Sequence, residues 1–117
     1  MSSHPVAKIP YTALLGQILL RHRERLKLHQ SDLANALNIS QPAYSRIEQG
    51  GTSITVSQLR IIGRRLGIAP SYLLNEADQW TQKLQVQGAE VTDQKEVPQG
   101  ALLVALGLLA ALWAVSQ

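Results

Sequence analysis

The chain of 117 residues contains no cysteine and no phenylalanine. The absence of cysteine excludes a disulfide framework, thiol catalysis and a cysteine-based zinc site. The only aromatic residues are two tryptophans and three tyrosines, so aliphatic side chains must form the core, which favours helices. The length corresponds to one small domain with appendages, since domains usually contain about 100–150 residues.

The sequence also lacks the patterns on which most catalytic sites depend. It contains no glycine-rich phosphate loop, no nucleophile elbow and no pair of carboxylates in an apolar segment. His22 and His29 have no third ligand at a useful spacing. We therefore expect no enzymatic activity, no metal site and no cofactor.

Charge is distributed unevenly along the chain. Residues 1–75 carry nine Lys and Arg against three Asp and Glu, a net charge of +6, whereas residues 76–117 have a net charge of −3. A basic front half suits contact with nucleic acid. The first twelve residues are too polar for a signal peptide, so we expect the front half to stay in the cytoplasm.

Apolar spacing and capping residues predict an all-α fold. We expect five helices, over residues 12–26, 30–37, 41–49, 56–66 and from residue 70 onward, the last continuing toward Leu84 or giving way to a sixth. The chain then divides into a flexible N-terminal arm over 1–11, a helical domain over 12–77, a helix extension and linker over 78–99, and a hydrophobic helix over 100–117.

The segment from His29 to Gly50 carries the strongest local pattern. Asn38 can adopt the left-handed conformation of a tight turn between two helices, and Ser40 is a good N-cap for the second of them. Ala34 is small enough for the close helix contact that this arrangement needs. The pattern predicts a helix-turn-helix.

The second of these helices has two faces of different chemistry. Tyr44 and Ile47 are expected to turn toward the core. Glutamine can bind adenine through two hydrogen bonds, and arginine can bind guanine O6 and N7 in the same way. The outward face, which would read DNA bases, consists of Gln41, Pro42, Ser45 and Arg46.

The segment from about Gly16 to Leu74 contains Arg23, Gln30, Leu33-Ala34, Ile39-Ser40, Ile47-Glu48, Gly50, Leu59, Leu66-Gly67 and Leu73-Leu74. On these residues the chain resembles the XRE or lambda-repressor/Cro-like helix-turn-helix family. It implies a five-helix domain that binds double-stranded DNA, usually as a two-fold dimer on a palindrome. It also implies a partly buried ion pair between Arg23 and Glu48, with Gln30 supporting the recognition helix and touching phosphate.

Further phosphate contacts are expected at the start of that helix and on the next one. Ser40 stands at a helix N-terminus, where exposed amides can hold phosphate. Arg60 and Arg64 can contact phosphate or simply form a solvated face. Three residues depart from the family pattern: His29 replaces a Ser or Thr cap, His22 occupies a usually apolar position, and Ile54 replaces a common proline.

The C-terminal segment has no charged residue between Ala101 and Val115. Fifteen residues span about 22 Å as a helix, less than a hydrocarbon core of about 30 Å, although counting from Val97 reaches that thickness. The segment can therefore be a membrane anchor, a dimerisation helix, or a helix that lies against the fifth one. The residues expected to make the contacts of this dimerisation or membrane helix are Leu102, Leu103, Leu106, Gly107, Ala111 and Trp113.

These observations predict a sequence-specific DNA-binding transcriptional regulator, expected to be a repressor that acts as a homodimer. Two alternatives stay open. One is a membrane-anchored helix-turn-helix scaffold whose C-terminus is tethered to the inner membrane, and the other is an antitoxin-type autorepressor with a toxin partner.

Overall fold

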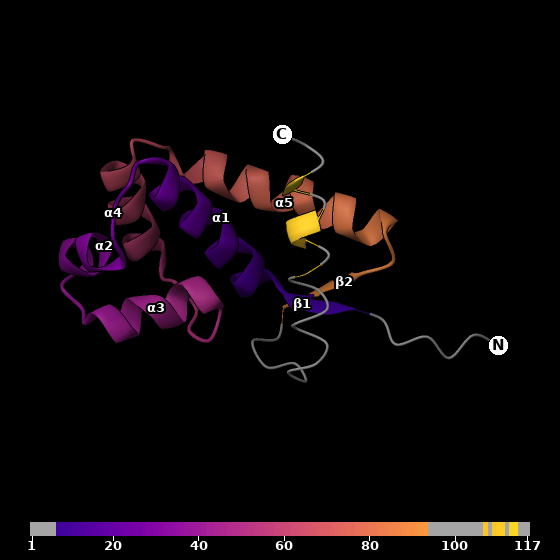
Figure 1. The fold of residues 1–117 in the computed structure, drawn as a ribbon, viewed down its shortest axis with the longest axis horizontal. Helices are drawn as coiled ribbons and strands as arrows, with labels where there is room; N and C mark the ends of the chain where they lie inside the picture. The colour runs from indigo at the N-terminus through magenta and orange to yellow at the C-terminus, as the bar shows by residue number, and fades with distance from the viewer. Residues whose placement is uncertain (1–6, 94–106, 108, 112, 115–117) are drawn as a thin grey trace.

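The computed structural model describes residues 7–93, 107, 109–111 and 113–114, and it is mostly helical. Two short strands flank the helices (Figure 1). The elements in chain order are β1 (Lys8–Pro10), α1 (Tyr11–Arg25), α2 (Gln30–Leu37), α3 (Gln41–Gln49), α4 (Val56–Leu66), α5 (Pro70–Val86) and β2 (Glu90–Thr92).

Helices α2, α3 and α4 have the bounds that the sequence predicts, because capping residues fix both of their ends. The Ser40 hydroxyl accepts from the Ala43 N–H at 3.2 Å, and Thr55 and Gln58 form a reciprocal capping box at the start of α4. Asn38 ends α2 with a φ of 58°, and Gly50 ends α3 with a φ of 81°. Local sequence therefore sets the limits of these helices.

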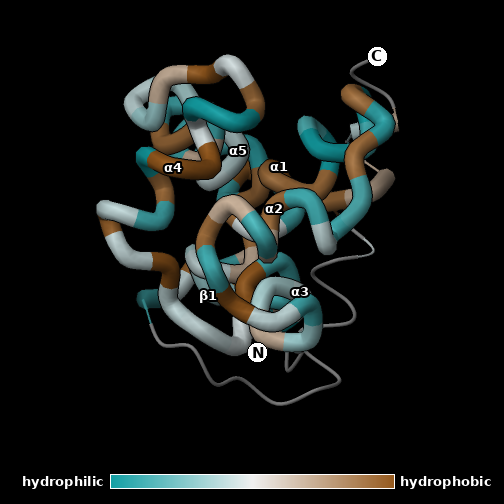
Figure 2. The backbone as a smooth tube through the Cα atoms, turned by 90° about the vertical axis from the view of Figure 1, so that its left-hand side faces the viewer, coloured by the Kyte–Doolittle hydropathy of each residue, from teal (hydrophilic) through white to brown (hydrophobic). Residues whose placement is uncertain are grey.

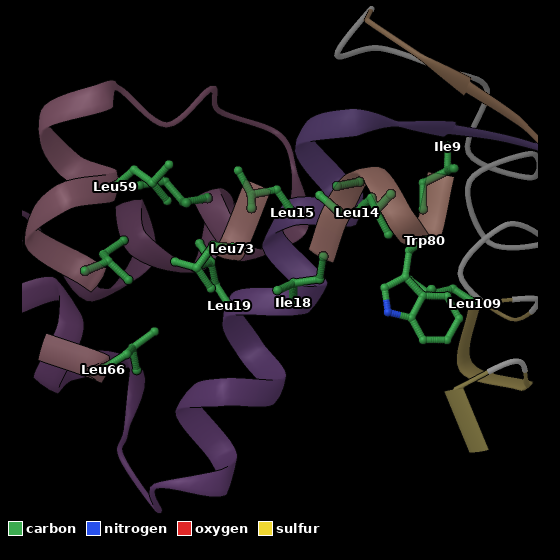
Figure 3. Close-up of a cluster of buried hydrophobic side chains, with 14 of the residues drawn as sticks. Ile9, Leu14, Leu15, Ile18, Leu19, Leu59, Leu66, Leu73, Trp80 and Leu109 are labelled. Atoms are coloured by element: carbon green, nitrogen blue, oxygen red, sulfur yellow. The ribbon is translucent and has the colours of Figure 1, made fainter. Parts of the chain in front are cut away.

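Helix α1 lies at the centre of the domain and packs against both α3 and α5. Its buried residues include Leu14, Ile18 and Leu19, which meet Leu73 of α5 and the rest of an aliphatic core (Figure 3). Gly16 allows α3 to approach closely, since a Cβ atom there would overlap the carbonyl oxygens of Ile47 and Glu48. The position of α3 on the domain thus depends on a glycine in α1.

The prediction of a flexible N-terminal arm is wrong for residues 7–11, the part of the arm that the structure describes. Strand β1 pairs in parallel with β2, and Ile9, which faces Val91 across the pair, is fully buried. Helix α1 also begins at Tyr11, one residue before the predicted start at residue 12. The remainder of the expected arm, residues 1–6, lies outside the described residues.

The predicted division after residue 77 and the predicted linker also need correction. Helix α5 runs without interruption through that boundary, because Ala77, Trp80 and Leu84 continue one buried face. Strand β2 then lies within the expected linker, held to the N-terminal segment by the Glu90 N–H, which donates to the Ala7 carbonyl at 2.7 Å. The two ends of the domain are therefore joined.

Near the C-terminus the described residues are helical and face the domain with large side chains. Leu109 and Trp113 are buried, whereas Gly107 and Ala111 are exposed. The ring centres of Trp113 and of Trp80 in α5 are 5.1 Å apart. The described C-terminal residues therefore pack against α5. The predicted Leu102, Leu103 and Leu106 fall outside the described residues. Within the described residues, no helix combines the length and hydropathy needed to cross a membrane.

Candidate nucleic-acid interface

Helices α2 and α3 are joined by a turn whose geometry depends on three residues. The left-handed Asn38 reverses the chain, and the Ile39 N–H donates to the Ala34 carbonyl at 3.0 Å. Ala34 is 1 % exposed, so α3 crosses α2 at close range. In Figure 2, which looks onto α2 and α3, the α3 backbone is coloured mainly hydrophilic or neutral.

The structure divides α3 into the two faces that the sequence suggests. Tyr44 and Ile47 are buried, and Gln41, Pro42 and Arg46 are exposed. Ser45 is half-buried between the two faces. Its hydroxyl accepts from the Gln49 side chain at 3.3 Å.

Gln49 extends the outward face of α3 and was not among the predicted site residues. It is exposed and lies one turn beyond Ser45. The signal that could have found it is the spacing of four residues, which places side chains on one helical face. The face therefore ends in an amide close to Gly50.

A buried ion pair joins α1 to α3. The Arg23 Nε atom donates to Glu48 Oε2 at 2.7 Å, and its Nη2 atom donates to Oε1 at 3.0 Å. The Glu48 side chain is only 1 % exposed, and Arg23 also donates to the Leu28 carbonyl at 3.0 Å. The bond to Glu48 raises the pKa of Arg23 above its usual value, which keeps the guanidinium charged.

A chain of hydrogen bonds leads from this ion pair to the outward face of α3. Gln30 Nε2 donates to Glu48 Oε1 at 2.9 Å, and Gln41 Nε2 donates to Gln30 Oε1 at 2.6 Å. A carboxylate can only accept hydrogen bonds, so the amide of Gln30 must turn its nitrogen inward and its oxygen outward. The same reasoning then directs the nitrogen of Gln41 toward Gln30.

This network leaves a defined set of atoms on the Gln41 amide. Its carbonyl oxygen and its second N–H are not used in the bonds to Gln30. One acceptor beside one donor matches the N6 amino group and the N7 atom of adenine. Guanine presents two acceptors in the major groove and would leave the Gln41 oxygen without a donor.

Tyr44 lies beneath this network as a core residue. Its side chain is fully buried, and its hydroxyl lies near the Glu48 carboxylate. Burial and the nearby charge of Glu48 raise the pKa of this phenol. Tyr44 is therefore uncharged and does not stack on a base.

The other predicted phosphate-contacting residues are Ser40, next to Gln41 in the chain, and Arg60 and Arg64 on α4. Ser40 is exposed where α3 begins. Arg60 and Arg64 are exposed on α4 and line a hollow of about 330 Å³ at the corner between α4 and α5. Helix α2 lies between α3 and α4 (Figure 1), so the two arginines are not brought next to the outward face of α3.

The departures at His29 and His22 have structural explanations. The His29 backbone N–H donates to the Asp32 carboxylate at 2.7 Å, so Asp32 stabilises the start of α2. His22 is buried on α1, with Nε2 at 2.8 Å from Glu76 Oε1 of α5. A polar side chain at this position is tolerated because it has a partner.

Two helices crossing at a tight turn, with a polar outward face braced from behind, define a helix-turn-helix. The helix-turn-helix family model matches residues 19–73, and this segment belongs to the XRE/lambda-repressor-like family that the sequence resembles. The family consists of DNA-binding regulators and is not typically enzymatic, which indicates a DNA-binding transcription regulator. No curated protein and no solved structure matches the chain.

Proposed function

We propose that the protein is a sequence-specific transcriptional repressor that binds a palindromic operator as a homodimer. The observation that carries this proposal is the hydrogen-bonded chain from the buried ion pair to Gln41, because it fixes the atoms that a base would meet. A DNA-binding domain implies a cytoplasmic location. The basic front half would add affinity through phosphate contacts.

Each residue of the outward face has a separate role in this proposal. Gln41 would bind adenine, and Arg46 would bind guanine through O6 and N7. Pro42 and Ser45 would line the groove beside them. Gln30, Ser40, Arg60 and Arg64 would contact phosphates.

The test is selection of operators from a library of random DNA duplexes, followed by affinity measurement at several salt concentrations. The proposal expects a palindromic site, one adenine per half-site that depends on Gln41, and affinity that falls steeply with salt through counterion release. A preference that is unchanged in Gln41→Ala would remove Gln41 from base reading. Binding without sequence preference would contradict a sequence-specific repressor.

A second variant tests the fixed orientation of the Gln41 amide. In Glu48→Gln the buried group can donate as well as accept, so Gln30 and Gln41 can turn over. The discrimination between adenine and guanine at the Gln41 position should then weaken, measured at matched occupancy. Glu24→Gln is the matched control, since Glu24 lies on the exposed face of α1. Repression itself is tested by the expected rise of a reporter when the protein is removed.

A further inference from the structure

The C-terminal helical residues are held to the domain by a stack of four side chains. The Arg21 guanidinium lies 4.1 Å from the centre of the Trp113 ring, and the Trp113 and Trp80 rings are 5.1 Å apart. The Lys83 ammonium lies 4.4 Å from the Trp80 ring on the α5 side. The two indoles thus lie between the two cations, each cation is attracted electrostatically to the ring beside it, and the rings add apolar area. Of the four residues, only Arg21 falls within the matched family segment.

The place that Trp113 fills is built by α1 and α5, not by the C-terminal segment itself. Trp80 is 5 % exposed, and Leu109 packs beside it with 1 % exposure (Figure 3). Without residues 109 and 113, the Trp80 ring would lose contacts that keep it from water. The Trp113 indole therefore fills a slot between Arg21 and Trp80 that α1 and α5 supply.

Trp113 meets this slot through side-chain contacts, one with a guanidinium and one with an indole ring. Such contacts do not depend on which copy of the chain supplies the segment. Residues 94–106 join β2 to the C-terminal helical residues, and thirteen residues can span up to about 45 Å. That reach is long enough for the segment to fill the same slot on a second molecule.

We propose that two copies of the protein exchange their C-terminal segments, so that Trp113 of each copy lies between Arg21 and Trp80 of the other. The exchange keeps every contact of the slot and closes with two-fold symmetry, which is a low-cost route to a dimer. It rests on the proposed function in one respect, because a palindromic operator requires the dimer. The segment thus acts as the dimerisation element while it remains packed on α5.

The absence of cysteine makes this exchange directly measurable. Gln79 is exposed and lines the same cleft as Trp113, and Ala114 is exposed next to Trp113. Two variants, Gln79→Cys and Ala114→Cys, are co-expressed with tags of different size and treated with a short thiol crosslinker. The matched control pairs Ala114→Cys with Ser57→Cys, an exposed position on α4.

If the segments exchange, we expect a covalent product that contains one copy of each variant. This product should be at least tenfold more abundant than the corresponding product of the Ser57→Cys control pair. It also expects Trp113→Ala to lower the dimer fraction in sedimentation while the helical circular dichroism is retained. The proposal is overturned if the double variant Gln79→Cys/Ala114→Cys links only within one chain while the intact protein sediments as a dimer. In that case the dimer required by the proposed function stands and uses another surface.

Two further results would also overturn the exchange. If the intact protein is a monomer both free and on its operator, the exchange fails together with the homodimer of the proposed function. If phospholipid vesicles carry the protein upward on flotation and abolish the crosslink, the segment binds a lipid surface and does not join two copies.

Discussion

Neighbouring residues of α1 form two polar contacts that differ in kind. Arg23 meets Glu48 of α3 through two hydrogen bonds, with side chains 12 % and 1 % exposed. His22 meets Glu76 of α5 through a single contact of 2.8 Å, where Glu76 is 21 % exposed. The first contact is buried, and hydrogen bonds through Gln30 and Gln41 connect it to the outward face of α3. The second lies closer to water and ends at α5, so the α3 side of α1 should be far less tolerant of change.

The largest effect is expected for Glu48→Ala on the α3 side. Removing one partner of a buried ion pair leaves Arg23 without compensation and Gln30 without its acceptor, which should lower the free energy of unfolding by about 3–5 kcal/mol. Urea denaturation measures this loss of unfolding free energy. Glu24→Ala should change the same quantity by less than about 0.5 kcal/mol, since Glu24 is exposed. Equal losses in the two variants would contradict the buried role of Glu48.

Gly16→Ala is the next test, because it acts on the same helix contact without removing a charge. The added methyl group would overlap the backbone of Ile47 and Glu48, so α3 must shift away from α1. We expect a loss of about 1–3 kcal/mol in unfolding free energy, together with weaker operator binding. Gly51→Ala is the control, because a Cβ atom added there would meet no described atom closer than the Arg46 carbonyl oxygen at 3.8 Å.

A third test separates reading of bases from stability. Arg46 is exposed, so Arg46→Ala should leave the unfolding curve nearly unchanged. It should cost about 1–3 kcal/mol in operator binding and relax the preference at one base pair. Footprinting and competition against mutated operators measure both effects. An identical base preference in the variant would exclude Arg46 from that role.

The smallest effect is expected on the α5 side, for Tyr11→Phe. The Tyr11 hydroxyl donates to Asp78 Oδ1 at 2.9 Å, and burial with this bond raises the phenol pKa to about 12 from 10.0. The raised pKa means that the contribution to stability is present below pH 10 and is lost as pH rises through about 12. The variant should lose about 0.5–1.5 kcal/mol at neutral pH. The wild-type advantage should disappear in alkaline denaturation, and its persistence there would contradict the Tyr11 assignment.

The two sides of α1 also differed in how well the sequence predicted them. The bounds of α2, α3 and α4 followed from caps such as Ser40 and Thr55, which act within a few residues. The roles of Arg23 and Glu48 came from the family resemblance. The outward placement of Gln41 and Arg46 followed from helical periodicity. Interactions between residues close together in the sequence therefore predicted the helix bounds and the outward face near α3.

The α5 side depended on contacts between distant parts of the chain. Strands β1 and β2 have three residues each and lie about eighty positions apart, so no local alternation reveals them. The arm predicted over residues 1–11 includes Pro10, whose fixed φ suits the residue before a helix. The contact between His22 and Glu76 and the stacking of Trp113 on Trp80 likewise need the folded arrangement.

Three successive residues of α1 each bind a different neighbour: Arg21 stacks on Trp113, His22 contacts Glu76, and Arg23 pairs with Glu48. Successive side chains on an α-helix point about 100° apart, which is why one short stretch can serve three directions. Insertion or deletion of a single residue just before this stretch would turn all three side chains away from their partners together. The helix therefore tolerates a changed side chain here far better than a changed length.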